Sequence, residues 1–215
     1  MRIFLIIVVL AVTAALAGCV ETRFESPPGD NIETCDAHWK GLWSGDKDTP
    51  HDTTAFYIDD ECHFIVLDQV DKGGPLKQIH VPVNYVHDGD RDYIVVADNM
   101  LKGLVELKPV YGVDPPPAKA FFFMRYSVHG DRIDLYKIDD ARVARLVIDG
   151  KLDGTVAKTG SELHVFVRGD RARMLEILQK DSIFVDKADP VLHRVRESVA
   201  EYERALIQAQ RQAKP

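Results

Sequence analysis

The chain has 215 residues, a formal net charge of −7 at pH 7, and hydrophobic residues at 46% of its positions. This length and composition fit one globular domain with a short appendage and exclude a disordered chain. The acidic balance and the lack of a basic stripe argue against nucleic acid as a partner, because a negative chain repels phosphate.

The first 18 residues have the pattern of a signal peptide. Met1 and Arg2 open the chain, and residues 3–17 are apolar apart from Thr13. This run is shorter than the roughly 20 residues that a membrane-spanning helix needs. It fits the apolar region of a signal peptide followed by small residues at the cleavage site. A membrane anchor or a buried helix is the alternative interpretation.

The residues Leu16-Ala17-Gly18-Cys19 end this apolar run. They resemble the lipobox, the processing site of bacterial lipoprotein precursors. The resemblance implies cleavage between Gly18 and Cys19, a diacylglycerol on the cysteine thiol, and acylation of the new amino terminus. Each buried CH₂ of such an anchor contributes about 0.8 kcal/mol. Because Val20 follows the cysteine, the resemblance also implies an outer-membrane protein facing the periplasm, with the inner membrane or the cell surface as alternatives.

A polar segment at 19–34, which contains Pro27-Pro28-Gly29, predicts a lipidated tether. The folded domain is then expected at 35–197. A C-terminal helix is expected at 198–213, where the residues at 198–201 form a capping box. The predicted organisation is therefore signal peptide, tether, β domain and terminal helix.

Cys35 and Cys62 remain as a pair if Cys19 carries the lipid. The periplasm is oxidising, so a disulfide is the leading interpretation. In the chain-entropy model such a bond stabilises the fold by about 3–4 kcal/mol. Two unpaired buried thiols are the alternative. A Cys₂His₂ metal site with His38 and His63 is disfavoured because the spacing does not match a zinc finger, and we expect no metal.

The residues Gly41-Leu42-Trp43 resemble the G-x-W motif of lipocalins. The resemblance implies an eight-stranded barrel that holds a small apolar ligand, with the tryptophan packed across the closed end. Trp39 and Trp43 are then candidate ligand-binding residues. The alternative is that both tryptophans are core or edge aromatics beside a turn glycine, and the number of expected strands exceeds eight.

Short segments with strand patterns follow from residue 53 onwards, separated by turn signals such as Asp88-Gly89 and Asp149-Gly150. Their even spacing predicts a mainly β fold, an antiparallel sandwich or barrel. Parallel pairs would need long crossover connections, which the pattern lacks. The expected strands lie at 53–58, 62–70, 80–86, 93–97, 103–110, 120–128, 132–138, 141–148, 152–157, 162–167, 183–185 and 191–195.

One short helix is expected near 171–180, before the C-terminal helix, because Asp170 can cap its first turn. The stretch 166–184, which reads as strand, helix and strand, is similar to the ends of many uncharacterised Gram-negative envelope lipoproteins. That similarity implies no activity.

The sequence lacks the motifs of known catalytic sites. It has no G-x-S-x-G, S-x-x-K or H-E-x-x-H pattern and no glycine-rich phosphate loop, so we expect no cofactor. The acids around Asp88 are better explained as a hairpin turn than as a calcium site.

The leading hypothesis is a non-enzymatic, membrane-anchored periplasmic lipoprotein that binds another envelope or effector protein. An inhibitor, immunity or assembly role fits this class, and an acidic surface suits a basic target. A lipocalin-like carrier of a small apolar ligand is the second hypothesis. An unrecognised hydrolase is the third.

Overall fold

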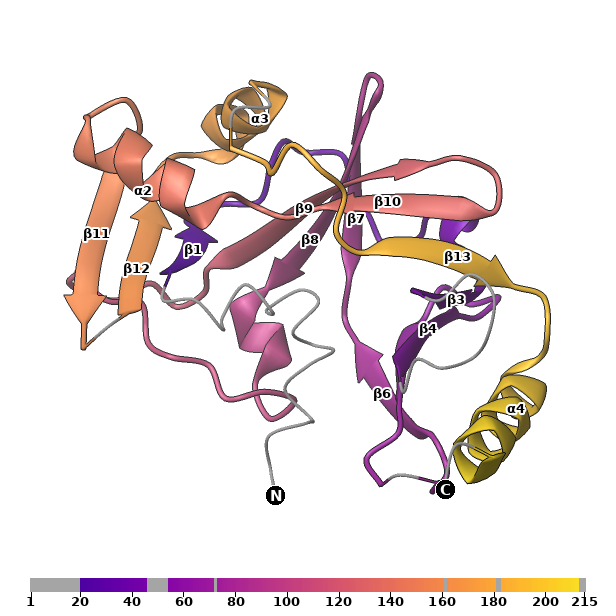
Figure 1. Cartoon of the computed structure of the whole chain (residues 1–215). Helices are drawn as coiled ribbons and strands as arrows, with labels where there is room; N and C mark the ends of the chain where they lie inside the picture. Colours follow the sequence, from indigo (N-terminus) through magenta and orange to yellow (C-terminus); the bar gives the residue numbers. More distant parts are fainter. Residues whose placement is uncertain (1–19, 46–53, 72, 161, 181–182, 213–215) are drawn as a thin grey trace.

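The computed structural model describes residues 20–45, 54–71, 73–160, 162–180 and 183–212 (Figure 1). The expected signal peptide and the lipobox at 16–19 lie outside the described residues. The described chain is mainly β, which confirms the predicted fold class. Its elements are β1 (Val20–Phe24), β2 (Ile32–Glu33), η2 (Ala37–Trp39), β3 (Gly41–Ser44), β4 (Thr54–Ile58), β5 (Phe64–Asp68), β6 (Lys77–Val81), β7 (Asn84–Asp88), β8 (Arg91–Ala97), η3 (Asp98–Leu101), β9 (Phe121–Val128), β10 (Arg132–Tyr136), α2 (Asp140–Ile148), β11 (Gly154–Thr159), β12 (Glu162–Val167), α3 (Arg171–Gln179), β13 (Val191–Val195) and α4 (Val199–Gln212).

The strands of the described chain belong to one open sheet of 13 strands, and most of them curl around a central core. β3, β4, β5 and β6 pair in antiparallel order, as do β7, β8, β9 and β10, and β13 joins β10 to β3. Only Pro82 and Val83 separate β6 from β7, so the chain itself links the two halves where no ladder closes the sheet. Proline suits this corner because it has no N–H to donate to a ladder.

Every strand of this ring, from β3 to β10 together with β13, contributes to one buried apolar cluster. In β9, for example, the alternate residues Phe122, Met124 and Tyr126 all belong to the cluster. The sheet therefore encloses its core with side chains from all sides.

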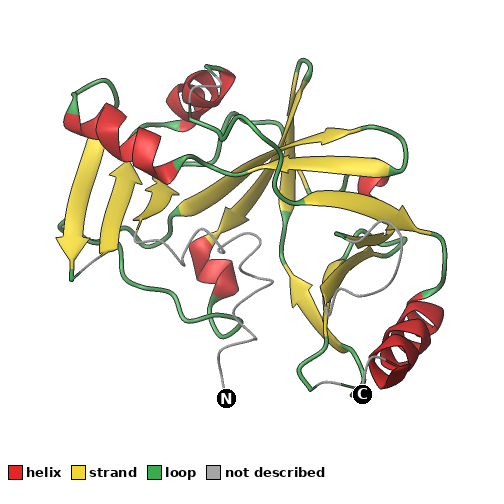
Figure 2. Cartoon of the chain, viewed as in Figure 1, coloured by secondary structure: helices red, strands yellow, loops and turns green. Residues whose placement is uncertain are grey.

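A second lobe extends from the start of β9. There β1 lies between β12 and β9, and β11 forms the outer edge. The helices α2 and α3 cover one face of the lobe and share an apolar core with it (Figure 2). The η3–β9 loop (residues 102–120) lies on the other face, where Gly112 packs on Ala157.

The N-terminal segment differs from the expected tether. Residues 20–24 form β1, and Phe24 is fully buried in the lobe core. The strand was not predicted because Glu21 and Arg23 make the segment look polar, whereas in the structure the two side chains form an ion pair. β1 also runs parallel to β12, which contradicts the expectation of a purely antiparallel sheet. The long connection that a parallel pair needs is supplied by the intervening chain, because β1 and β12 lie far apart in the sequence.

Three expected strands are not strands. Residues 141–148 belong to α2, whose N-cap Asp139 accepts a hydrogen bond from the backbone of Arg142 at 3.0 Å. Val143 and Ala144 are buried, and the partly buried Leu146 and Val147 pack against the same core, at the three- and four-residue spacing of one helix face. The segments at 103–110 and 183–185 form only isolated bridges.

The two predicted helices near the C-terminus are present as α3 and α4. α4 packs on the outer face of β3, β4 and β5, where Tyr202 is buried and its hydroxyl lies 3.3 Å from Ser44 Oγ. In the described chain, no helix combines the length and apolar character needed to cross a membrane.

Candidate functional site

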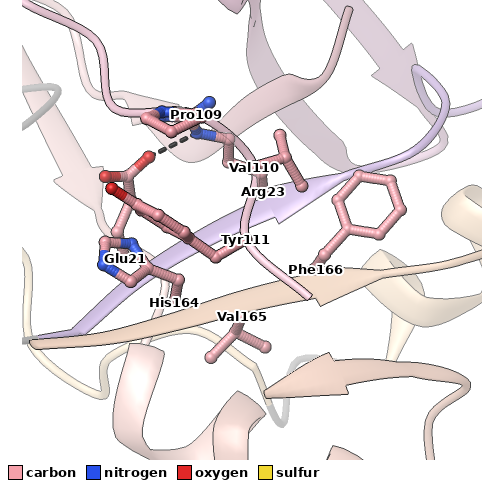
Figure 3. A pocket seen from close by; sticks show the side chains of 8 residues that line it. All are labelled: Glu21, Arg23, Pro109, Val110, Tyr111, His164, Val165 and Phe166. Atoms are coloured by element: carbon pink, nitrogen blue, oxygen red, sulfur yellow. Dashed lines mark hydrogen bonds and ion pairs between the residues drawn. The ribbon is translucent and has the colours of Figure 1, made fainter. Parts of the chain in front are cut away.

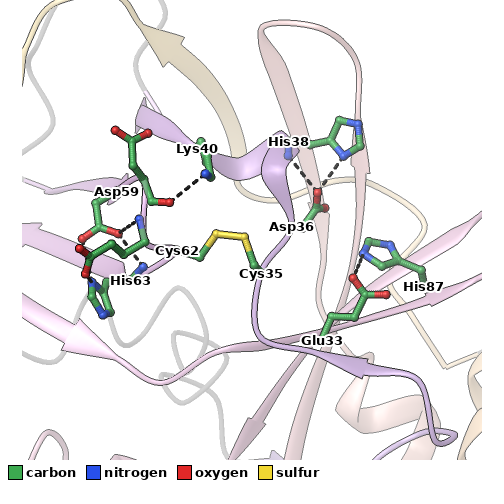
Figure 4. The surroundings of a disulfide bond; sticks show 11 residues. Glu33, Cys35, Asp36, His38, Lys40, Asp59, Cys62, His63 and His87 are labelled. Atoms are coloured by element: carbon green, nitrogen blue, oxygen red, sulfur yellow. Dashed lines mark hydrogen bonds and ion pairs between the residues drawn. A yellow bond between two sulfur atoms is a disulfide. The ribbon is translucent and has the colours of Figure 1, made fainter.

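Cys35 and Cys62 form a disulfide, which confirms the predicted pairing (Figure 4). Their Cα atoms are 5.3 Å apart, and the bond joins the segment before η2 to the turn between β4 and β5. His38 and His63, the histidines considered for a metal site with these cysteines, each contact a neighbouring aspartate. Within the described ranges, no group of three or more metal-ligating side chains is arranged around a common point.

Trp39 and Trp43, the candidate ligand-binding residues, are both fully buried in the ring core. The Trp39 ring packs against the rings of Phe64, Tyr85 and Tyr126, at centroid distances of 5.8, 6.3 and 5.4 Å. Trp43 Nε1 donates a hydrogen bond to the carbonyl of Trp39 at 2.7 Å. These contacts favour the core-aromatic interpretation of both tryptophans.

Arg194 on β13 explains the glycine of the G-x-W motif, and sequence reasoning missed it. Its guanidinium lies 4.2 Å from the ring centroid of Trp43 and donates to the carbonyls of Lys40 at 2.5 Å and His38 at 3.2 Å. Gly41 has φ +111°, and a Cβ there would lie 2.6 Å from the Arg194 side chain. Glycine is therefore required where the arginine crosses β3.

A buried carboxylate, Asp36, lies next to the disulfide at the start of η2. It accepts hydrogen bonds from the Tyr126 hydroxyl at 2.5 Å and from the His38 backbone at 2.9 Å. The exposed His38 ring contacts the same carboxylate at 2.7 Å. Burial pushes the pKa of Asp36 upwards, but these hydrogen bonds outweigh it and lower the pKa. Asp36 thus joins the solvent-exposed histidine to the ring core.

Two further histidine–carboxylate pairs flank the disulfide. His63 Nδ1 lies 2.8 Å from Asp59, and this hydrogen bond raises the pKa of His63. His87 Nδ1 lies 2.6 Å from Asp92; burial lowers the pKa of His87, but the contacts with Asp92 outweigh it and raise the pKa. Both histidines therefore become protonated at a higher pH than an ordinary histidine does.

A pocket in the lobe lies between β1, β12 and the η3–β9 loop (Figure 3). Arg23 donates to the carbonyl of Lys108 at 2.7 Å, and its guanidinium lies 3.3 Å from Asp98 and pairs with Glu21. Asp98 also accepts from the backbone of Ala120 at 2.8 Å. Asp98 therefore closes the base of the loop, and Arg23 holds its middle to β1.

His164 lines the same pocket beneath the ring of Tyr111, with ring centroids 4.4 Å apart. Its Nε2 lies 2.7 Å from Thr159 Oγ1, and Glu162 lies 3.7 Å from the same nitrogen. Burial lowers the pKa of His164, so the imidazole is neutral at pH 7. In a nucleophilic relay the acid orients the second ring nitrogen, so this arrangement differs from a catalytic triad.

The outer edge of the lobe is open. β11 is the last strand of the sheet and pairs with β12 through all six of its residues. Figure 1 shows no element of the described chain beside its other edge. Ile148, at the end of α2, is 70% exposed and is one of the large apolar side chains that reach solvent. An edge of this kind presents unpaired N–H and C=O groups to another chain.

Comparison of the chain with protein-family models, curated proteins and solved structures found no match. The predicted Cys19 and Gly18 lie outside the described residues, while the disulfide and the tryptophans lie together near η2. Sequence reasoning missed the histidine–carboxylate pairs, because the turn or ladder that brings each histidine onto its aspartate was not predicted. The available signal was that each histidine has an aspartate two to five residues away in the sequence.

Proposed function

We propose that the protein is a lipid-anchored, non-enzymatic lipoprotein of the outer membrane that faces the periplasm. It binds an extended segment of another envelope or effector protein through the free edge of β11. The lipobox resemblance at 16–19 supports the anchor and the location. The open edge of β11 is the observation that carries the binding proposal.

The composition of β11 suits addition of a partner strand. The strand has no proline and carries a single charged residue, Lys158, so little blocks a second ladder. Proteins protect such edges with prolines, several charges or a covering loop. Backbone hydrogen bonds from a partner strand would supply affinity, and Ile148 at the nearby end of α2 would offer an apolar contact.

The interior of the ring supports a surface binder over a carrier of apolar ligands. The tryptophan rings occupy the space around η2 and contact the aromatic side chains of the surrounding strands. Likewise, Thr159 and Glu162 both contact the same nitrogen of His164, Nε2, and this geometry does not favour a hydrolase. A surface strand edge is compatible with an inhibitor, immunity or assembly role.

Replacing the predicted anchor residue tests the location. Cys19→Ser is expected to remove the acyl chains and to stop the protein from floating with outer-membrane vesicles, because a hydroxyl cannot form the thioether to diacylglycerol. Intact-mass spectrometry of the mature chain and density-gradient flotation measure both effects. Acyl chains that persist on the variant would show that the lipobox assignment is wrong.

Proline substitutions in β11 test the edge. Successive N–H groups of a strand point to opposite sides, and proline has no N–H. One of the two variants Val156→Pro and Ala157→Pro therefore removes an N–H that points to the free edge and leaves the ladder to β12 intact. That variant is recognised by a melting temperature close to that of the wild type. A photoreactive residue at Lys158 is expected to crosslink a protein partner in cells, with the adduct reduced at least tenfold in the stable proline variant.

The matched control is the same photoreactive residue at Arg211 on α4, on the other side of the molecule. It should give no adduct with the same partner. An adduct at Lys158 that survives the stable proline substitution contradicts strand addition, even if the partner is genuine.

A further inference from the structure

The sheet begins directly after the predicted anchor residue, Cys19, with almost no linker between them. β1 begins at Val20 and pairs with β12 through five consecutive residues. Its last two residues, Arg23 and Phe24, are 5% and 0% exposed, so the strand is part of the core. Consecutive Cα atoms lie 3.8 Å apart, so a lipid on Cys19 is held within one residue of the sheet.

The structures beside the start of β1 are fixed to it. Arg23 binds Asp98 at the base of the η3–β9 loop and the carbonyl of Lys108 in its middle. Lys108 in turn pairs with Glu162 at the start of β12. Figure 1 shows η3 and this loop on the side of the lobe where β1 and β12 begin, away from α2 and α3.

From these contacts we infer that the anchored protein sits directly on the bilayer, with η3 and the η3–β9 loop against the lipid headgroups. This inference rests on the proposed lipid anchor. Since the anchor adds only one residue before Val20, the side of the lobe on which β1 begins, where η3 and its loop lie, is held next to the membrane that carries the acyl chains. The occupant of this surface is therefore the phospholipid bilayer itself.

One large apolar side chain on this surface is exposed and would contact the headgroup layer. Met100 on η3 is 54% exposed, although its neighbour Leu101 is buried in the ring core. Ile148 is 70% exposed but lies at the end of α2, on the opposite side of the lobe. The two residues therefore form a matched pair of exposed apolar positions, one facing the bilayer and one facing away.

The test uses the full lipidated protein in vesicles of phosphatidylethanolamine and phosphatidylglycerol that contain a headgroup-nitroxide lipid. Met100→Cys and Ile148→Cys each add one free thiol for an environment-sensitive fluorophore, because the other cysteines carry lipid or form the disulfide. Quenching at position 100 is expected to exceed that at position 148 at least threefold.

A linker variant provides the control. Ten Gly/Ser residues inserted between Cys19 and Val20 add a span of about 17 Å on average and release the domain from the surface. Flotation should be retained, while quenching at position 100 falls to the level at position 148. Flotation with equal quenching at both positions in the original chain overturns the seating but leaves the anchor intact.

Two other results also overturn the seating. A fluorescence shift at position 100 that nitroxide lipids do not quench shows that protein, for instance a second copy, covers this surface. Loss of flotation in the unmodified chain shows that the anchor itself is absent, which separates failure of the proposed function from failure of the seating.

Discussion

Arg194→Ala is expected to lower the free energy of unfolding by about 2–4 kcal/mol. The substitution removes the guanidinium from the face of Trp43 and leaves two backbone carbonyls, those of Lys40 and His38, without their donor. It also opens space above Gly41, where the guanidinium now lies. These losses add because one side chain joins β13, β3 and the end of η2.

Chemical denaturation followed by tryptophan fluorescence measures this loss. Arg196→Ala is the matched control, because Arg194 and Arg196 both form ion pairs with Asp131, at 3.2 and 2.9 Å, yet the Arg196 side chain is 85% exposed. A surface ion pair of this kind contributes about 0–1 kcal/mol. Equal destabilisation by the two variants would show that Arg194 acts only as a surface charge.

The second large effect is a loss of stability with rising pH that originates at Asp140, the first residue of α2. Burial against β1 raises the pKa of Asp140 to about 7, with Glu21 and Asp139 adding to the shift and contacts with Thr22 opposing it. The folded state therefore holds a proton that the unfolded state releases near pH 4. Stability from this group falls as pH rises from about 4 to about 7 and then levels off.

Asp140→Asn removes this titration. The unfolding free energy of the variant minus that of the wild type is expected to increase by about 2–3 kcal/mol from pH 5 to pH 8, because the wild-type carboxylate ionises over this range and the amide does not. Urea denaturation at a series of pH values measures the difference. Asp149→Asn, at the other end of α2, controls for the loss of one acid from the helix. A pH-independent difference for Asp140→Asn would refute the shifted titration.

Local sequence patterns were sufficient for most of the fold. Alternating apolar residues located β4, β5, β8, β9, β12 and β13, and the capping residues Asp170 and Ser198 located α3 and α4. The pattern misled at α2, where the same apolar residues satisfy a helix and a strand, and Asp139 at its N-cap was the unused signal. Tertiary pairing decided such segments.

The side-chain contacts of the candidate site were harder to predict from the sequence, because they join residues that are far apart in the chain. The expected oxidising location led to the prediction of a disulfide, and the bond joins the two expected cysteines. By contrast, Arg194 reaches Lys40 across 154 positions, and Arg23 reaches Lys108 across 85. Nothing local marks either arginine as different from the other basic residues. The polar character of β1 also concealed a strand in which Arg23 pairs with Glu21 beside it and with Asp98 and the Lys108 carbonyl far along the chain.

The parallel pairing of β1 with β12 determines how the domain carries a mechanical load. A pull on the proposed anchor enters the fold at Val20 and acts along the axis of β1. The hydrogen bonds to β12 lie across that axis and are evenly spaced, so all five residue pairs of the register resist in shear at once. A hairpin at the same place would be peeled open one pair at a time. The N-terminal strand thus gives the proposed lipid anchor a firm point of attachment without a long linker.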